Sequence, residues 1–155
     1  MSARSKTRVV LAAGALALVV ASVASAIPTQ AMKLSARMNS AQVVPDKPKG
    51  KVAFAAGTFT GTLTPAGSKW KLAWKLTYSR LDNPSIVIAD IHYGKPGHFG
   101  PYVARLCGPC KASPQQGVTR IPASWIPAIK LGNTFMTILT GKNPNGEIRG
   151  QIRVR

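Results

Sequence analysis

Between Lys69 and Ser79, large apolar side chains occupy every second position, and all but Ala73 of the residues between them are polar. Successive side chains of a β-strand point to opposite faces, so this pattern predicts a half-buried strand. Its apolar face carries five large side chains, which are Trp70, Leu72, Trp74, Leu76 and Tyr78. At this strict spacing we interpret the two tryptophans as core residues, the alternative being a platform on which a ligand stacks.

Shorter runs of strand-forming residues recur along the chain, separated by turns rich in glycine and proline. We expect strands at 32–38, 51–55, 57–64, 69–79, 85–93, 102–106, 118–122, 134–140 and 147–154. One helical turn is expected within Ala123–Leu131, and Asn145-Gly146 predicts a hairpin between the last two strands. The sequence therefore predicts an all-β fold, an antiparallel Greek-key β-sandwich of about seven to nine strands, in preference to a closed barrel.

The first residues have the composition of a secretory signal peptide. Three basic residues come first, then an apolar run over 9–23, then the small residues Ala24-Ser25-Ala26 for cleavage. The alternative is an uncleaved membrane anchor, because the apolar run approaches the roughly 17–25 residues that span a bilayer. The predicted division is a signal peptide over 1–26, a flexible leader over 27–31 and one domain over 32–155, with no membrane span after cleavage.

The chain is strongly basic, with 21 lysines and arginines, four acids and a formal net charge of +17. Loss of the three basic residues in the signal segment leaves 18, and a net charge of +14. Such a field attracts polyanions, including wall polymers, acidic polysaccharide, phospholipid head groups and nucleic acid. The alternative is that the charge only keeps a secreted protein soluble. Because the basic residues are scattered singly, without an aromatic-plus-basic RNA motif, we expect no specific nucleic acid partner.

Cys107-Gly108-Pro109-Cys110 contains both cysteines of the chain. The spacing matches a thioredoxin-type redox pair, in which a helix N-terminus lowers the pKa of the first thiol. Since no helical pattern follows, we expect a structural disulfide that holds the end of a strand in an exported protein. Two alternatives stay open, namely redox work by the pair and a zinc site that adds His92 and His98. His92 is otherwise interpreted as a hydrogen-bonded structural histidine.

Patterns typical of catalysis are weak in this sequence. The four acids, Asp46, Asp82, Asp90 and Glu147, are spread along the chain, whereas a paired-carboxylate mechanism needs two within about 5–10 Å. The sequence contains no Gly-x-Ser-x-Gly elbow and no phosphate-binding glycine loop followed by a helix. Glu147 and Arg149 are two residues apart on one predicted strand and share a face, so we interpret them as an ion pair. We expect a protein that is not an enzyme, with no catalytic residues and no cofactor.

Two stretches of the sequence, 89–103 and 137–152, resemble the CHRD domain. This family is named for its repeats in chordin and also occurs alone in secreted bacterial proteins. The most specific part is the run Gly-Glu-Ile-Arg-Gly-Gln at 146–151, and the likeness extends over about 33–154. The positions that carry the resemblance are Asp90, His92, Gly94, Gly97, Gly100, Pro101, Gly146, Glu147, Arg149 and Gly150.

The resemblance implies a secreted β domain with no established catalytic chemistry and, in chordin, a neighbourhood of growth-factor binding. Asp90 stands where the family pattern resembles the first histidine of His-Ile-His, and Ile138-Leu139-Thr140 stands where it resembles Val-His-Thr. These departures deplete the histidines that a copper or zinc site would need.

We therefore expect an extracellular binding or structural module whose basic surface contacts an anionic cell-surface polymer or another extracellular protein. The alternative is a small extracytoplasmic redox or metal-binding protein centred on Cys107 and Cys110, with His92 and His98 as further metal ligands. The oligomeric state is left open.

Overall fold

The computed structural model describes residues 30–82, 85 and 87–155. The predicted signal peptide over 1–26 lies outside the described residues. Of the predicted leader over 27–31, only Gln30 and Ala31 are described, and they precede the first strand. Within the described ranges, no helix is both long enough and apolar enough to cross a bilayer.

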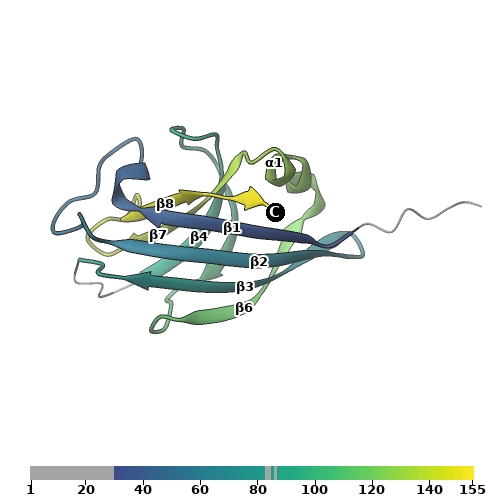
Figure 1. The fold of residues 1–155 in the computed structure, drawn as a ribbon, viewed down its shortest axis with the longest axis horizontal. Coiled ribbons are helices and arrows are strands. Elements are labelled where there is room, and N and C mark those ends of the chain that lie inside the picture. The colour runs from purple at the N-terminus through teal and green to yellow at the C-terminus, as the bar shows by residue number, and fades with distance from the viewer. Residues whose placement is uncertain (1–29, 83–84, 86) are drawn as a thin grey trace, which may run out of the picture.

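Within the described residues the chain forms nine strands of one antiparallel sheet (Figure 1). The strands are β1 Met32–Asn39, β2 Ala56–Ala66, β3 Lys69–Ser79, β4 Val87–Tyr93, β5 Tyr102–Cys107, β6 Gln115–Pro122, β7 Thr134–Thr140, β8 Ile148–Gln151 and β9 Arg153–Val154. The helical elements are the 3-10 helices η1 Ser40–Gln42 and η2 Ala123–Trp125 and the short helix α1 Ile126–Lys130. The expected helical turn within 123–131 is confirmed.

The strand order is β5-β4-β7-β8-β1-β2-β3-β6, with β9 paired to β1. Figure 1 shows β1, β2, β3 and β6 side by side as one layer, with β4 and β7 behind it. The two edge strands, β5 and β6, lie close to each other. Thr119 of β6 donates a hydrogen bond of 3.2 Å from Oγ1 to the Arg105 carbonyl of β5. The all-β antiparallel class is confirmed. The sandwich differs in detail, since both layers belong to one sheet that nearly closes into a barrel-like form.

The core lies between the two layers and is built by the alternation seen in the sequence. Leu72, Trp74 and Leu76 of β3 are buried, and the intervening side chains face outward. Trp74 is 6% exposed, and its indole N–H donates to Thr119 Oγ1 at 3.1 Å, while Trp70 packs against the core from its edge. The interpretation as a core residue is confirmed for Trp74, whereas Trp70 is partly buried at the margin of the core.

Three strand predictions need correction. Residues 51–55 form a turn instead of a strand, because Val52 and Ala55 are buried three residues apart and are joined by a local hydrogen bond. Strand β6 begins three residues earlier than predicted, at Gln115. The predicted last strand divides at Ile152, whose N–H donates to the Thr134 carbonyl. Its first part, β8, pairs with β7, and its second part, β9, pairs with β1.

Candidate functional site

Residues 94–101, called the central loop from here on, join β4 to β5 and lie against the outer face of β8. The Arg149 guanidinium donates from Nη2 to the carbonyl oxygens of Lys95 at 3.1 Å and His98 at 2.8 Å. The Gln151 amide donates from Nε2 to the Gly94 carbonyl at 2.7 Å. The structure therefore brings together the two stretches that carry the family resemblance, through side chains of the last strand and the backbone of the loop.

A stack of side chains supports the central loop from below. Phe135 of β7 is buried between the Arg149 guanidinium carbon, 3.7 Å from its ring centroid, and the His92 ring, 5.5 Å away and tilted by 15°. His92 Nδ1 lies 3.1 Å from the Gly100 carbonyl oxygen, so the expected hydrogen bond of His92 is present. The loop is thus held at both ends and in its middle.

Arg149 is 3% exposed and has no carboxylate partner among the described residues. Burial lowers the pKa of Arg149 from its ordinary value. Two backbone carbonyls and the negative face of the Phe135 ring replace the missing anion. Its other terminal nitrogen, Nη1, is buried with no hydrogen-bond partner in the described part of the chain.

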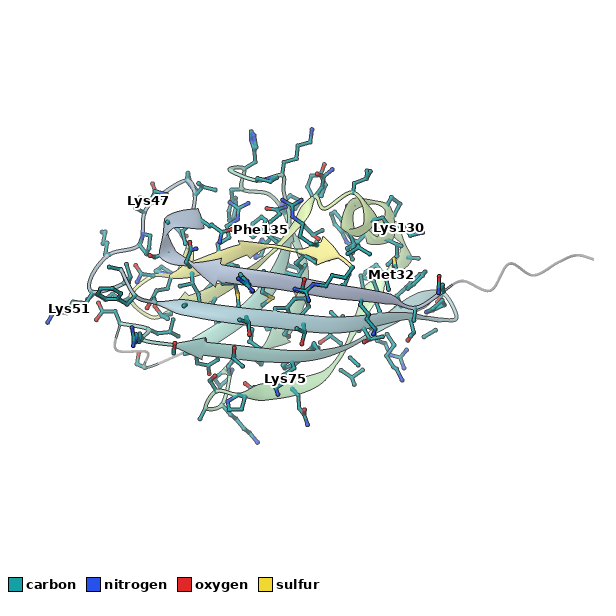
Figure 2. The ribbon with its side chains drawn as sticks, viewed as in Figure 1. Met32, Lys47, Lys51, Lys75, Lys130 and Phe135 are labelled. Atoms are coloured by element: carbon teal, nitrogen blue, oxygen red, sulfur yellow. A yellow bond between two sulfur atoms is a disulfide. The ribbon has the colours of Figure 1, made fainter. Side chains whose placement is uncertain are left out.

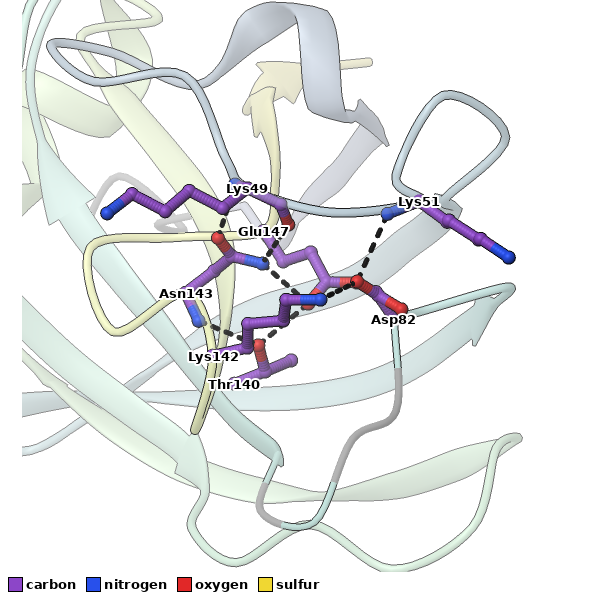
Figure 3. Close-up of polar contacts among 7 residues, drawn as sticks. All are labelled: Lys49, Lys51, Asp82, Thr140, Lys142, Asn143 and Glu147. Atoms are coloured by element: carbon purple, nitrogen blue, oxygen red, sulfur yellow. Dashed lines mark hydrogen bonds and ion pairs between the residues drawn. The ribbon is translucent and has the colours of Figure 1, made fainter.

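The expected ion pair between Glu147 and Arg149 is wrong. Glu147 precedes β8 and follows Gly146, whose φ of +123° turns the chain, so the strand alternation does not extend to it. Its fully buried carboxylate accepts hydrogen bonds from the Asp82 N–H, from Thr140 Oγ1 at 2.7 Å and from Asn143 Nδ2 at 3.1 Å (Figure 3). Glu147 therefore ties the loop before β4 to the β7–β8 hairpin.

Asp82 extends this network toward the surface. Its Oδ2 accepts hydrogen bonds from Lys142 Nζ and from the Lys51 N–H at 3.1 Å (Figure 3). The side-chain hydrogen bond from Lys142, followed by the backbone bond from Lys51, lowers the pKa of Asp82 below its ordinary value. The loop around residue 51 is thereby joined to the same hairpin.

The lowered pKa predicts an acid-sensitive contribution to stability. The free carboxyl titrates near 3.9, so the stabilisation by charged Asp82 is complete above that pH and is lost as the pH falls through the lower, folded-state pKa. We expect Asp82→Asn to be less stable than wild type at pH 6 and the difference to shrink below about pH 4. Urea unfolding of both proteins from pH 6 to 2.5 measures this. A difference that stays constant down to pH 2.5 would contradict the assignment.

Asp90 of β4 forms an ion pair with Arg105 of β5. Arg105 of β5 donates from Nε to Oδ1 at 2.9 Å and from Nη2 to Oδ2 at 3.1 Å, and Asp90 is 3% exposed. This two-pronged contact, chiefly its hydrogen bonds, raises the pKa of Arg105. Asp90 is therefore a structural residue that links β4 to β5.

The remaining signature positions are glycines and a proline. Gly94, Gly97, Gly100 and Pro101 lie in the central loop. Gly150 lies where β8 passes close to β1, and a Cβ atom there would collide with the Arg37 carbonyl group. The structure therefore explains Gly150 as a requirement for close strand packing.

Cys107 and Cys110 form a disulfide at the end of β5, as predicted. The Cys110 N–H also donates to the Val87 carbonyl at 2.7 Å, so the disulfide-bonded segment is held against the start of β4. The next regular element is strand β6. The helix N-terminus that lowers the pKa of a thioredoxin-type cysteine does not follow this pair.

The alternative zinc site is not assembled. In the β4–β5 pair Cys107 lies opposite Ala89, whereas His92 lies opposite Tyr102, so the cysteines and His92 are at opposite ends of the pair. His98 is on the exposed side of the central loop. Across residues 30–82, 85 and 87–155, no group of three His, Cys, Asp or Glu side chains is placed to hold a metal ion.

The outer face of the β1, β2, β3 and β6 layer collects basic side chains. These cations, called the basic face from here on, are Lys33, Arg37, Lys69, Lys71, Lys75 and Arg120. Strand register places Lys71 beside Arg120 and Lys75 beside Thr60. Figure 2 labels Lys75 and Phe135 and shows these two residues in separate places.

A shallow hollow of about 380 Å³ on the basic face is lined by Lys33, Lys75 and Arg155, with Thr60 and Thr62. No aspartate or glutamate of the described residues lines it. Three of the chain's four acids are engaged elsewhere, Asp82 and Asp90 by cations and Glu147 in the buried network. None of the basic-face cations forms an ion pair with a carboxylate of the described residues.

Sequence reasoning missed several residues that build these networks. Phe135 and Gln151 hold the central loop, and Thr140 and Asn143 hold the Glu147 carboxylate. Alternation along the last strand does place Gln151 on the same face as Arg149. That pattern carries no information about which distant loop the two side chains contact.

A protein-family model described as the CHRD domain matches residues 34–152, which is most of the chain. No curated protein matches the sequence, and no solved structure does.

Proposed function

The chain belongs to the CHRD domain family, and from that premise we propose that it is a secreted, non-catalytic module that binds anionic extracellular polymers through its basic face. The observation that carries this proposal is the group of outward cations, none of which forms an ion pair with a carboxylate of the described residues. Export is supported by the composition of residues 1–26 and by the Cys107–Cys110 disulfide, which suits an oxidising compartment.

The geometry of the basic face suits a linear partner. Lys69, Lys71 and Lys75 lie on one side of β3, where alternate residues repeat about every 6.8 Å. Cross-strand neighbours add a second row of charge at Arg120. Cations in rows along neighbouring strands match the repeated anions of a polymer better than they match one compact ligand.

A non-catalytic role is supported by the state of the acidic side chains. Asp82 and Asp90 each face a basic partner, and Glu147 is fully buried among hydrogen-bond donors. A general acid or base must reach a substrate proton at hydrogen-bond distance. Carboxylates that are engaged in this way stabilise the loops and strands that they connect.

Binding to immobilised heparin, used as a model polyanion, tests the proposal. We expect retention that falls steeply with added salt, because exposed charges are screened over about 10 Å at 0.1 M. The triple change Lys71→Gln, Lys75→Gln and Arg120→Gln is expected to weaken binding about 100-fold, at roughly 1 kcal/mol per cation at an anionic surface.

The matched control changes Lys95, Lys111 and Lys130 to glutamine, since these lysines are exposed, lie outside the basic face and carry the same total charge. We expect the control to bind within about threefold of wild type. Equal losses in both variants would show that net charge alone is responsible. That result, absent binding, or retention that does not change with salt would each overturn the proposal.

A further inference from the structure

A groove of about 310 Å³ lies between the central loop and the segment that follows β1. Gln42 and Pro96-Gly97 line its sides, and Arg149, Gln151 and Arg153 line it from β8 and β9. No aspartate or glutamate of the described residues lines it. Its volume is at the lower end of the roughly 300–1,000 Å³ found for small-molecule sites.

The polar groups of the groove are asymmetric in their hydrogen bonding. Gln42 Nε2 donates to the Arg37 carbonyl, and Gln151 Nε2 donates to the Gly94 and Gly132 carbonyls. Both N–H groups of the Gln151 amide and one of the two N–H groups of the Gln42 amide are therefore engaged with backbone carbonyls. Neither amide oxygen has a hydrogen-bond donor among the described residues, so each is free to accept a hydroxyl proton.

The two guanidinium groups provide the complementary half of the site. Arg149 is 3% exposed, and its Nη1 has no partner in the described part of the chain. Arg153 is exposed beside it along the last strands. Arg149 Nη1 is closed to solvent and is therefore not a contact for a ligand. Guanidinium groups bind carboxylate, sulfate and phosphate oxygens strongly, so two arginines that line one groove favour an anionic ligand.

An anion alone would leave the two amide oxygens unused, and a neutral sugar would leave the two guanidinium groups unused. We propose that this groove binds a single acidic sugar unit, whose anionic group faces Arg149 and Arg153 and whose hydroxyls donate to Gln42 and Gln151. The inference deepens the proposed function, on which it rests for the extracellular polymer that supplies such a unit.

The groove is continuous with the basic face. A second hollow of about 390 Å³ shares Gln42, Gln151 and Arg153 with the groove and shares Arg155 with the hollow beside Lys33. A polymer lying on the basic face thus reaches the groove without leaving the positive surface. The groove would select the chemistry of one unit, and the basic face would supply affinity for the chain.

Titration of isotope-labelled protein with glucuronate, followed by nuclear magnetic resonance, tests the groove. We expect the Gly97 amide, the Gln42 and Gln151 side-chain amides and the Arg149 Nε–H to shift with one common affinity. Glucose and sodium chloride at equal concentration should leave them unchanged. Glucose 6-phosphate and galactose 6-sulfate then distinguish which anionic group binds most tightly.

Arg153→Gln is the test variant, because Arg153 holds no part of the central loop, whereas loss of Arg149 would also release that loop. We expect Arg153→Gln to weaken glucuronate binding about tenfold and Lys75→Gln to leave it within twofold. No shift with glucuronate, or equal shifts with sodium chloride, would overturn the groove. If heparin still binds when glucuronate does not, the groove proposal fails and the proposed function stands. If glucuronate binds and heparin does not, only the proposed function is overturned.

Discussion

Replacing Glu147 by alanine is expected to lower the free energy of unfolding by about 4 kcal/mol. The fully buried carboxylate accepts three hydrogen bonds, from the backbone of Asp82 and from the side chains of Thr140 and Asn143. Each hydrogen bond to a charged group contributes roughly 1.5–3 kcal/mol, and truncation also leaves the donors unpaired and a cavity behind. Urea unfolding followed by tryptophan fluorescence measures the loss.

Two further substitutions separate the hydrogen bonds from other effects. Glu147→Gln keeps the volume but presents an amide N–H to donors, so we expect a loss of about 2 kcal/mol. Asp46→Asn removes an exposed acid of the adjacent loop and should change stability by less than about 0.5 kcal/mol. A Glu147→Ala protein within about 1 kcal/mol of wild type would show that the buried network does not hold the hairpin.

Replacing Arg149 by methionine is expected to lower the free energy of unfolding by about 3 kcal/mol and to release the central loop. The substitution removes two charge-assisted hydrogen bonds, to the carbonyls of Lys95 and His98, and the contact of the guanidinium with Phe135. Water can solvate the freed carbonyls of the exposed loop, which keeps the loss below the full sum. Urea unfolding measures the stability, and amide hydrogen exchange of residues 94–98 measures the loop.

Arg149→Lys provides the matched control for charge. A lysine keeps the cation but cannot present a planar group to the Phe135 ring and two carbonyls together, so we expect roughly half the loss. The loop amides should exchange faster in both variants, while those of β3 follow only the global stability. Unchanged exchange in the loop of Arg149→Met would contradict the proposed fastening.

Local patterns in the sequence predicted much of the fold. Strict alternation located β3 to the residue, and the Asn-Gly signal located the last hairpin. The strand prediction for 51–55 was wrong, because buried residues in a short turn resemble a strand when only five residues are available to judge periodicity. The predicted sandwich did not include the near closure of one sheet, because strand order depends on pairings between distant segments.

The candidate site was only partly predictable. The signature residues His92 and Arg149 were identified, and the disulfide was expected at the correct pair. The partner assigned to Arg149 was wrong, since adjacency on a strand suggested Glu147. Its actual partners are loop carbonyls 51 and 54 positions away in the chain.

The sequence by itself determined the β class, the buried face of each alternating strand, the staple at Cys107 and Cys110 and the excess of positive charge. These features depend on side-chain periodicity of two, on cysteine spacing and on composition, all of which are local or additive. Only the tertiary structure decided which polar groups meet. The strand order places β8 between β7 and β1 and against the central loop, which buries Arg149 and forms one side of the groove. A buried polar group must find its partners wherever the packed chain provides them, and no local pattern encodes that choice.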